Sequence, residues 1–169
     1  MQDLFDLSGE AQAGTESLAE GALVLHGFAV KQATALLAAI AEVGAVAPFR
    51  RMVTPGGYEM SVAMTNCGTA GWVTDRKGYR YARLDPESGK PWPALPPPLL
   101  ALADAAAAMA DYLGFVPDAC LVNRYEPGAR LSLHQDRDEA DYRHPIVSVS
   151  LGLPATFQFG GLKRSDPVK

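Results

Sequence analysis

A histidine and an aspartate two residues apart, His134 and Asp136, are the residues best suited to chemistry in this sequence. They follow Leu131 and Leu133, so the run alternates apolar and polar residues as a half-buried strand does. Because successive side chains of a strand point to opposite faces, His134 and Asp136 would share one face and could reach one ion. One imidazole and one carboxylate are two of the three ligands of a non-haem Fe(II) facial triad. The spacing therefore predicts an iron site whose third ligand is a distant histidine.

An amide and a phenol precede this pair by one expected hairpin. Asn123 and Tyr125 would share a face of a strand, and the turn at residues 126–128 would bring them back beside His134. Both side chains can hydrogen-bond to a bound carboxylate. We therefore expect Asn123 and Tyr125 to line the same cavity as the metal pair.

Each of these features also has an interpretation without chemistry. An isolated histidine–aspartate pair is usually a surface histidine near an acidic residue. Trp72 could be a core residue, and Tyr79 an ordinary half-buried strand aromatic. The acidic run at residues 138–141 could be a solvated turn. Four basic residues could be plain surface charge or could face phosphates: Arg76, Lys77, Arg80 and Arg83.

Helices dominate the first part of the expected fold. Apolar residues recur at helical spacing from Lys31 to Val46, and Pro48 ends this helix. A second helix is expected from Leu99 to Leu113, with Gly114 as its C-terminal stop. The proline-rich stretch 85–98 between them predicts a loop.

Short strands make up the rest of the expected fold. One strand is expected at 23–25, and a strand-and-loop region is expected to break at 55–57 and at 66–68. From Ala119 onward the period changes to two, which predicts strands at 119–125, 130–134, 146–151 and 156–159. Helices followed by short strands favour an α+β domain whose C-terminal part is an antiparallel sandwich or barrel.

Composition excludes several classes of protein. The 169 residues carry a net charge of −4, so any nucleic-acid contact must come from a local patch. Two cysteines, Cys67 and Cys120, are too few for a disulfide scaffold or a four-cysteine zinc site. The first residues lack a basic secretory signal, and the most apolar stretch, 99–109, is too short to span a bilayer. We expect a cytoplasmic, monomeric protein without a membrane segment.

Longer strings of residues resemble the bacterial AlkB family. They are NRYEPG at 123–128, HQDRDE at 134–139, VSVSLG at 147–152 and FQFGG at 157–161, with MVTPGGY at 52–58, SVAMTNCG at 61–68 and KPWP at 90–93 upstream. Together they cover most of the chain from about Leu23. The members of this family are Fe(II)- and 2-oxoglutarate-dependent dioxygenases that repair alkylated bases.

The resemblance implies a fold, a reaction and its cofactors. The fold would be α+β, with a double-stranded β-helix (jelly-roll) core, N-terminal helices and a nucleotide-recognition lid. The reaction would be oxidative demethylation of 1-methyladenine and 3-methylcytosine in single- or double-stranded DNA, with RNA as a second candidate substrate. Fe(II), 2-oxoglutarate and dioxygen would be required, and formaldehyde would be released.

The resemblance also implies a role for individual residues. His134 and Asp136 match two iron ligands, and Asn123 and Tyr125 match contacts to 2-oxoglutarate. The substrate contacts are implied as follows: Trp72 stacks on the damaged base, Asp138 meets its exocyclic nitrogen, Tyr79 lies near the nucleic-acid backbone, Arg164 lines the pocket, and Thr54 and Met64 belong to the lid.

The C-terminal end departs from the family pattern. The family's second iron-binding histidine and the arginines that hold 2-oxoglutarate lie beyond the segment that matches residues 157–161, whereas this sequence ends at Lys169. His144 is too close in sequence to the metal pair to be that distant ligand. We therefore expect a C-terminally truncated member, without the later strands of the jelly-roll. The alternative is a catalytically inactive fragment that still binds nucleic acid.

The expected organisation is one domain in three parts. Residues 1–20 would form an N-terminal arm, residues 21–115 would form the helices and the lid, and residues 116–169 would form a partial jelly-roll core.

Overall fold

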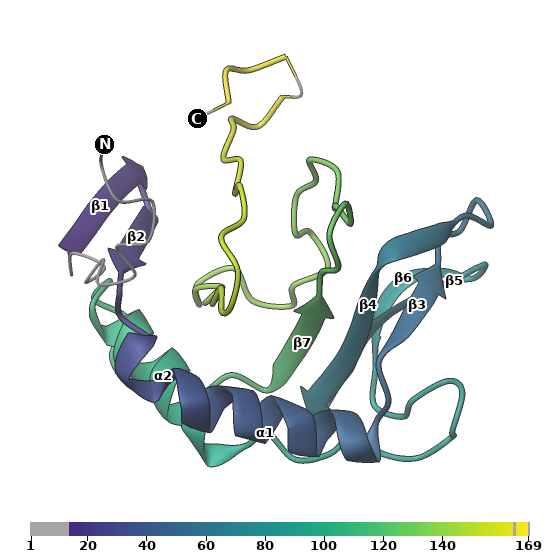
Figure 1. Ribbon diagram of the computed structural model, residues 1–169. Helices are drawn as coiled ribbons and strands as arrows, with labels where there is room; N and C mark the ends of the chain where they lie inside the picture. Colours follow the sequence, from purple (N-terminus) through teal and green to yellow (C-terminus); the bar gives the residue numbers. More distant parts are fainter. Residues whose placement is uncertain (1–13, 164, 169) are drawn as a thin grey trace, which may run out of the picture.

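The computed structural model describes residues 14–163 and 165–168 (Figure 1). Its elements, in chain order, are β1 (Gly14–Ala19), β2 (Ala22–His26), the 3-10 helix η1 (Val30–Gln32), α1 (Ala33–Val46), β3 (Arg50–Val53), β4 (Glu59–Gly68), β5 (Gly71–Asp75), β6 (Gly78–Ala82), α2 (Pro97–Ala108) and β7 (Ala119–Arg124). Helices and antiparallel strands are both present, in agreement with the expected α+β class.

The three-stranded sheet β3-β4-β7 forms the centre of the described fold. The long strand β4 pairs antiparallel with β3 on one side and with β7 on the other. The register places Cys67 directly opposite Cys120, two cysteines that are distant in sequence. The hydrogen bond to Cys120, together with burial, raises the pKa of Cys67, so that side chain stays a thiol. Two further antiparallel hairpins, β1-β2 and β5-β6, complete the strand content.

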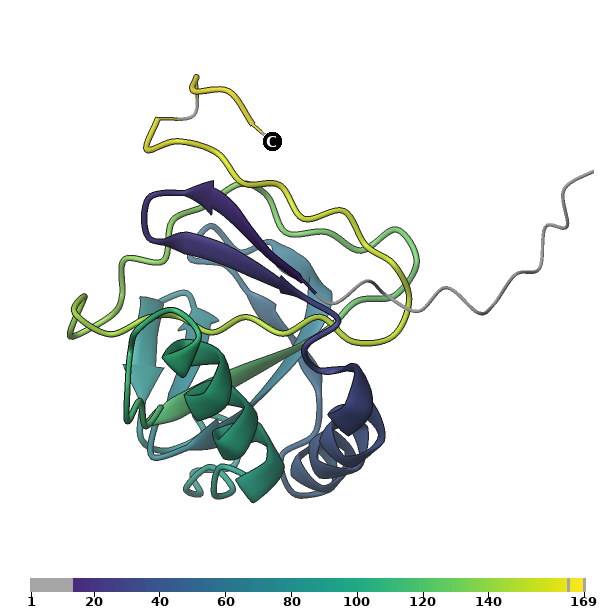
Figure 2. The ribbon, with the colours of Figure 1, turned by 90° about the vertical axis from the view of Figure 1, so that its left-hand side faces the viewer.

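Two helices lie side by side along one side of the sheet (Figure 2). Helix α1 contacts both α2 and β4. Its buried residues Leu36, Ala39 and Val43 recur at three- and four-residue intervals, which gives the helix one apolar face. Because β5 contacts β4 as well, the middle of β4 is buried on both faces, from Val62 to Cys67.

The hydrophobic core joins β4 to the β5-β6 hairpin. Its buried members come from β3, β4, β5 and the loops at either end: Ala47, Met52, Val62, Met64, Val73 and Trp92. The indole N–H of Trp92 donates to the carbonyl oxygen of Ala82 at the end of β6, at 2.9 Å. This core therefore fixes the position of the hairpin against the central sheet.

Four sequence predictions are confirmed by these elements. The helix expected at 31–46 is η1 followed by α1, and the strand expected at 23–25 lies within β2. The strand expected at 119–125 is β7, and the loop expected at 85–98 is found at residues 85–96, with α2 beginning two residues earlier than expected, at Pro97. In each case the spacing of apolar residues, or of prolines in the loop, predicts the element that the structure has.

Two predicted element boundaries were wrong. The second helix ends at Ala108, before Gly114, because Asp111 takes the left-handed conformation (φ 65°) and the N–H of Tyr112 bonds to the carbonyl of Ala107. The break expected at 66–68 is absent because β4 continues through Asn66 and Cys67, both of which pair with β7. Within the segment expected as an N-terminal arm at 1–20, residues 14–19 form strand β1.

The strands predicted after β7 were also wrong. Residues 130–134, 146–151 and 156–159 lie in irregular backbone, with a single bridge nearby, between Gly160 and Val168. Alternating residues become a strand only when their backbone groups find a neighbouring ladder. Within the described residues, these segments have none. No described helix is both long and apolar enough to cross a membrane.

Substituting the buried Gly71 tests the packing of the hairpin. A Cβ added there would lie 2.5 Å from Cε2 of Trp92 and 2.7 Å from Cβ of Asn66. We expect Gly71→Ala to lower the free energy of unfolding by about 1–3 kcal/mol through overpacking, measured by urea denaturation. Gly14→Ala is the control, because nothing lies within 4 Å of its added Cβ. Equal stability of the two variants would contradict the packing described here.

The buried carboxylate of Asp85 should make stability depend on pH. Burial alone would raise its pKa, but hydrogen bonds from Arg50 (2.5 Å), Ser88 (2.8 Å) and the backbone N–H of Glu87 lower the pKa to about 2. An unfolded aspartate titrates near 3.9. The stabilisation is therefore complete above about pH 4 and is lost as the pH falls toward 2.

We expect Asp85→Asn to cost about 1–3 kcal/mol of unfolding free energy at pH 7, because Arg50 loses the more buried of its two charged partners, Asp85 and Glu87. The gap from the wild type should shrink at pH 3, where the wild-type carboxylate also begins to lose its charge. Urea denaturation at both pH values measures this, with the exposed Asp104→Asn on α2 as the control. A gap that is the same at both pH values would show that the charge of Asp85 is not the cause.

Candidate active site

Three aromatic side chains share one face of the β5-β6 hairpin. Trp72 and Tyr81 are direct partners across the two strands, and Tyr79 lies two residues from Tyr81. Residues two apart on a strand point to the same side, as do direct partners. Tyr79 stacks diagonally on Trp72, with ring centroids 5.6 Å apart and planes inclined by 22°. The Trp72 ring is thus stacked on Tyr79 within the hairpin, and it also packs against the hydrophobic core.

The backbone of Trp72 is held by a buried amide. The side chain of Asn66, fully buried on β4, donates to the carbonyl of Trp72 at 2.9 Å and accepts from its N–H at 2.9 Å. Two bonds in opposite directions use both ends of the amide and fix the local backbone of β5. Asn66 therefore sets where the partly buried Trp72 ring can lie.

The predicted metal pair lies on the irregular segment after β7. The Nε2 atom of His134 is 3.6 Å from Oδ1 of Asp136, and both side chains are more than half exposed. Metal–ligand bonds of about 2.0–2.2 Å would let one ion reach both atoms. The Nδ1 atom of His134 lies 2.7 Å from the carbonyl oxygen of Ser132. With Nδ1–H donating to that carbonyl, the lone pair of Nε2 faces the position between the two side chains.

This donor set fits two ligands of a facial iron site. An imidazole nitrogen with its other nitrogen hydrogen-bonded, beside a free carboxylate oxygen, is the arrangement that metal-binding histidines adopt. Among the described residues, no third histidine, cysteine, aspartate or glutamate joins the pair. The Nε2 atom of His144 lies 3.8 Å from Oδ2 of Asp141, and the His144 ring packs against Phe115. Neither contact involves His134 or Asp136.

Two hydrogen bonds join the metal segment, the irregular stretch that holds residues 134–139, to the aromatic face of the hairpin. The indole N–H of Trp72 donates to Oδ2 of Asp138 at 3.0 Å, and the Tyr81 hydroxyl donates to Oε1 of Glu139 at 2.7 Å. Burial, and then the carboxylates of Glu139 and Asp136, raise the pKa of Tyr81, so its hydroxyl remains a donor. The structure thus brings Trp72, Tyr79 and Asp138 together beside the metal pair.

The residues expected to contact 2-oxoglutarate lie at the end of β7. Asn123 pairs with Met64 across the sheet, and Tyr125 follows the last residue of the strand, half exposed. Burial of part of its ring raises the pKa of Tyr125, so its hydroxyl also remains protonated. The described hydrogen bonds and ion pairs connect neither residue to His134 or Asp136. Their role in binding the cosubstrate stays a prediction.

Thr54 and Met64, the two residues predicted for the lid, make other contacts in the described structure. Thr54 caps the β3-β4 turn, where its side-chain oxygen accepts from the N–H of Tyr58 at 3.1 Å. Met64 is 1% exposed and belongs to the hydrophobic core. Arg164 lies outside the residues that the structure describes.

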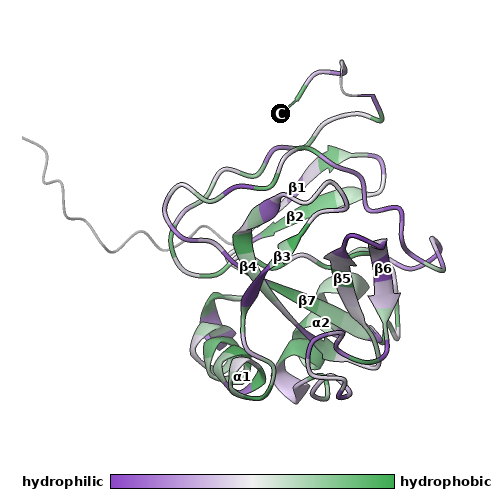
Figure 3. Ribbon diagram, turned by 90° about the vertical axis from the view of Figure 1, so that its right-hand side faces the viewer, coloured by the Kyte–Doolittle hydropathy of each residue, from purple (hydrophilic) through white to green (hydrophobic). Residues whose placement is uncertain are grey.

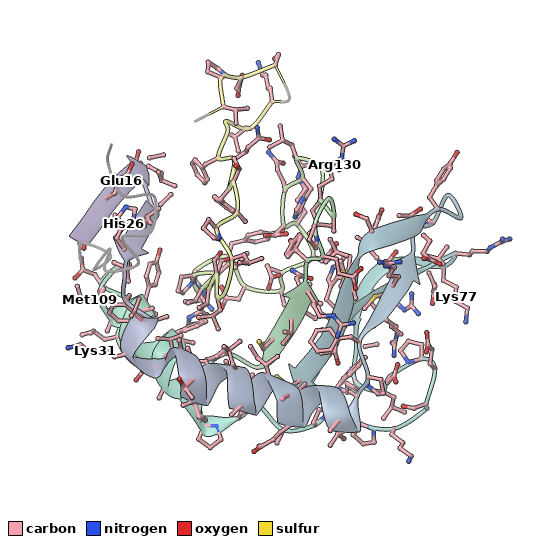
Figure 4. The ribbon with its side chains drawn as sticks, in the orientation of Figure 1. Glu16, His26, Lys31, Lys77, Met109 and Arg130 are labelled. Carbon is pink, nitrogen blue, oxygen red and sulfur yellow. The ribbon has the colours of Figure 1, made fainter. Side chains whose placement is uncertain are left out.

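The four basic residues flank the hairpin but are not equivalent. Arg80 is bound to Asp75 through two bonds of 3.0 and 2.7 Å, which also lower the pKa of Asp75 to about 2. Arg76, Lys77 and Arg83 are exposed. The hydropathy view shows the hydrophilic character of β5 and β6 (Figure 3), and Lys77 lies at the outer edge of the molecule (Figure 4). Exposed positive charges therefore lie at Arg76, Lys77 and Arg83, whereas the carboxylates of Asp138 and Glu139 contact the aromatic face of the hairpin.

Sequence reasoning missed three residues of this arrangement: Asn66, Tyr81 and Glu139. Tyr81 could have been found from its two-residue spacing to Tyr79, which places both rings on one face. Glu139 is adjacent to Asp138, but its partner lies 58 positions away, and no local pattern indicates that pairing. Asn66 looked like a turn residue, because its partner in β5 is known only from the packing.

Comparisons with known proteins show the family of this chain. The family model of the 2OG-Fe(II) oxygenase superfamily matches residues 21–169. The alpha-ketoglutarate-dependent dioxygenase AlkB is 59% identical in Escherichia coli K12 and 60% identical in Salmonella typhimurium LT2, over 98% of this chain and 77% of each relative. The DNA N(6)-methyladenine demethylase ALKBH1A of Arabidopsis thaliana is 37% identical over 57% of this chain and 28% of its own length. With matches of this extent, the chain belongs to the AlkB family of the 2OG-Fe(II) oxygenase superfamily.

Proposed function

We propose that this protein is a dioxygenase that demethylates alkylated nucleobases, with 1-methyladenine and 3-methylcytosine in DNA as its substrates. The observation that carries the proposal is the direct bond between Trp72 and Asp138, two residues that would hold the base, beside the pair His134 and Asp136 that would hold iron. The family to which the chain belongs uses Fe(II), 2-oxoglutarate and dioxygen.

Bound Fe(II) and 2-oxoglutarate supply the activation of dioxygen and the oxidation of the N-methyl group. The chain's own residues supply position. His134 binds through Nε2 while its Nδ1–H donates to Ser132, which fixes the ring orientation. Asn123 and Tyr125 would donate hydrogen bonds to the carboxylates of 2-oxoglutarate. Hydroxylation of the methyl group would be followed by loss of formaldehyde, which restores the base.

Charge explains why such bases would be selected. Methylation at N1 of adenine or N3 of cytosine leaves the ring positively charged at neutral pH. Asp138 places a carboxylate beside the Trp72 ring, and Glu139 places a second one at the neighbouring Tyr81. A cationic ring gains from these charges and from stacking on an indole, whereas an unmodified neutral base gains less. The exposed basic residues of the β5-β6 turn would contact the phosphates outside the pocket.

The finer features of the fold belong to this proposal as well. We assign the C-terminal part, whose described residues after β7 are irregular, to a partial jelly-roll core, and the β3-β4 hairpin with Thr54 and Met64 to a nucleotide-recognition lid. The division into an arm at 1–20, helices and lid at 21–115 and core at 116–169 goes with this assignment. We also propose that the protein acts as a monomer in the cytoplasm, with RNA as a second substrate.

Replacing His134 tests the metal site. We expect His134→Ala to abolish Fe(II)-dependent succinate formation from 2-oxoglutarate, a larger loss than the 10–100-fold that removal of an outer residue typically costs. His26→Ala is the matched control, because His26 pairs with Glu16 on the β1-β2 hairpin (Figure 4). Wild-type turnover in His134→Ala would exclude it as a ligand. A wild-type chain that binds nucleic acid without forming succinate would instead support the non-catalytic alternative.

Replacing Trp72 tests the base site separately. We expect Trp72→Ala to raise the KM for a 1-methyladenine oligonucleotide about tenfold or more, because stacking contributes about 1–3 kcal/mol per base. Trp72→Phe should retain much of the stacking but lose the bond to Asp138. Formaldehyde release measures demethylation, and succinate release without nucleic acid measures the metal site alone. A parallel loss of both activities in Trp72→Ala would make Trp72 a structural residue.

A further inference from the structure

The segment that carries the metal pair has little regular structure of its own. From Tyr125 to Lys163 the chain forms no helix or strand, so backbone ladders do not fix its position. Its first residues are anchored to β4, where the hydroxyl of Ser61 donates to the carbonyl of Arg130 at 3.0 Å and accepts from the N–H of Arg130 at 3.1 Å. Beyond Arg130, the position of the segment depends on side-chain contacts. Arg137 and the carbonyl of Leu162 both bond to Gln135, but these partners lie in the same irregular part of the chain.

The β5-β6 hairpin, in contrast, is rigidly placed. Its strands pair over five residues, its core residue Val73 is buried, and the buried amide of Asn66 holds its backbone. Tyr81 lies directly opposite Trp72 on this hairpin. A hydrogen bond from Trp72 or Tyr81 therefore fixes the position of the side chain that accepts it.

We propose that the Tyr81 hydroxyl is a positioning group for the metal site, because it holds Glu139 and so fixes the segment that carries His134 and Asp136. This inference rests on the proposed metal site. Asp138 and Glu139 are consecutive, and they bond to two rings on one face of the hairpin. One attachment point would leave the segment free to rotate, whereas two adjacent points fix its direction as well. Asp136 is only three residues before Glu139, so this direction sets where its carboxylate lies.

The partners of this bond are suited to the task. The acceptor is a carboxylate and the donor is a phenol, at 2.7 Å, a combination that is stronger than a bond between neutral groups. The pair is only partly buried, so solvent competes with the bond. The Trp72 bond to Asp138 has to accommodate a base when substrate binds. Tyr81 is therefore the attachment that can persist while the base site is occupied.

The test measures metal affinity without nucleic acid. Apo protein is titrated with Co(II), followed by its visible absorption, in the wild type and in Tyr81→Phe, Glu139→Ala and Glu139→Gln. We expect Tyr81→Phe and Glu139→Ala each to weaken Co(II) binding about 10–100-fold. Glu139→Gln keeps a carbonyl oxygen as acceptor and should restore most of the affinity. Tyr58→Phe, which removes a phenol from the exposed β3-β4 turn, should bind as the wild type does.

A second measurement reports the segment directly. The sequence has only two tryptophans, so the indole N–H signals of Trp72 and Trp92 can be resolved by NMR. In Tyr81→Phe the Trp72 indole proton should exchange faster with solvent, because Asp138 is less well held, while that of Trp92 stays bonded to Ala82.

The outcomes separate this inference from the proposed function. Co(II) affinity within twofold of the wild type in both Tyr81→Phe and Glu139→Ala would overturn the positioning role and leave the metal site intact. A wild-type protein that binds no Co(II) would overturn the metal site itself, and with it the positioning role. Additive losses in Tyr81→Phe/Glu139→Ala would also contradict the proposal, because two ends of one bond should show the same loss together as singly.

Discussion

The attachment of the β5-β6 hairpin to strand β4 is the interaction on which the rest of the site depends. Val62 and Met64 pack against Val73, Gly71 leaves room for Trp92, and Asn66 bonds both backbone groups of Trp72. Apolar burial supplies most of the stabilisation, and the amide supplies direction. With the hairpin fixed, Trp72, Tyr79 and Tyr81 lie at defined positions on one face of it. The metal segment binds to this face through Asp138 and Glu139.

Electrostatics at the site and over the whole chain act in different ways. A net charge of −4 would weaken any general attraction to nucleic acid. The acidic side chains at the site, however, face inward to the aromatic rings, whereas exposed arginine and lysine side chains lie at the hairpin's turn. Arg80 contributes little to this positive charge because Asp75 neutralises it. Attraction for a backbone and selection of a cationic base can therefore coexist in one small region.

The sequence predicted those parts of the site that local periodicity determines. A helical period was enough to find α1. The Nε2 atom of His134 and Oδ1 of Asp136 do lie 3.6 Å apart, but on irregular backbone, so the strand face from which their proximity was predicted is not its cause. The prediction of strands after β7 was wrong, because a strand needs a partner strand for its backbone hydrogen bonds. The alternation of apolar and polar residues does not show whether such a partner is present. The predicted end of α2 was wrong because the chain already turns into the left-handed conformation at Asp111, before Gly114. Bonds such as Asn66 to Trp72 depend on packing, so no local pattern could reveal them.

The two bonds that join Asp138 and Glu139 to the β5-β6 hairpin span 66 and 58 residues of chain, whereas the hairpin itself closes within twelve. Contacts between residues far apart in sequence carry a larger entropic cost of loop closure and form later in folding. We therefore expect the aromatic face to be complete before the metal segment binds to it. The same order applies in reverse to opening: the metal ligands should detach by a local fluctuation that leaves the hairpin and central sheet intact. The site can thus exchange its contents at a free-energy cost well below that of unfolding the protein.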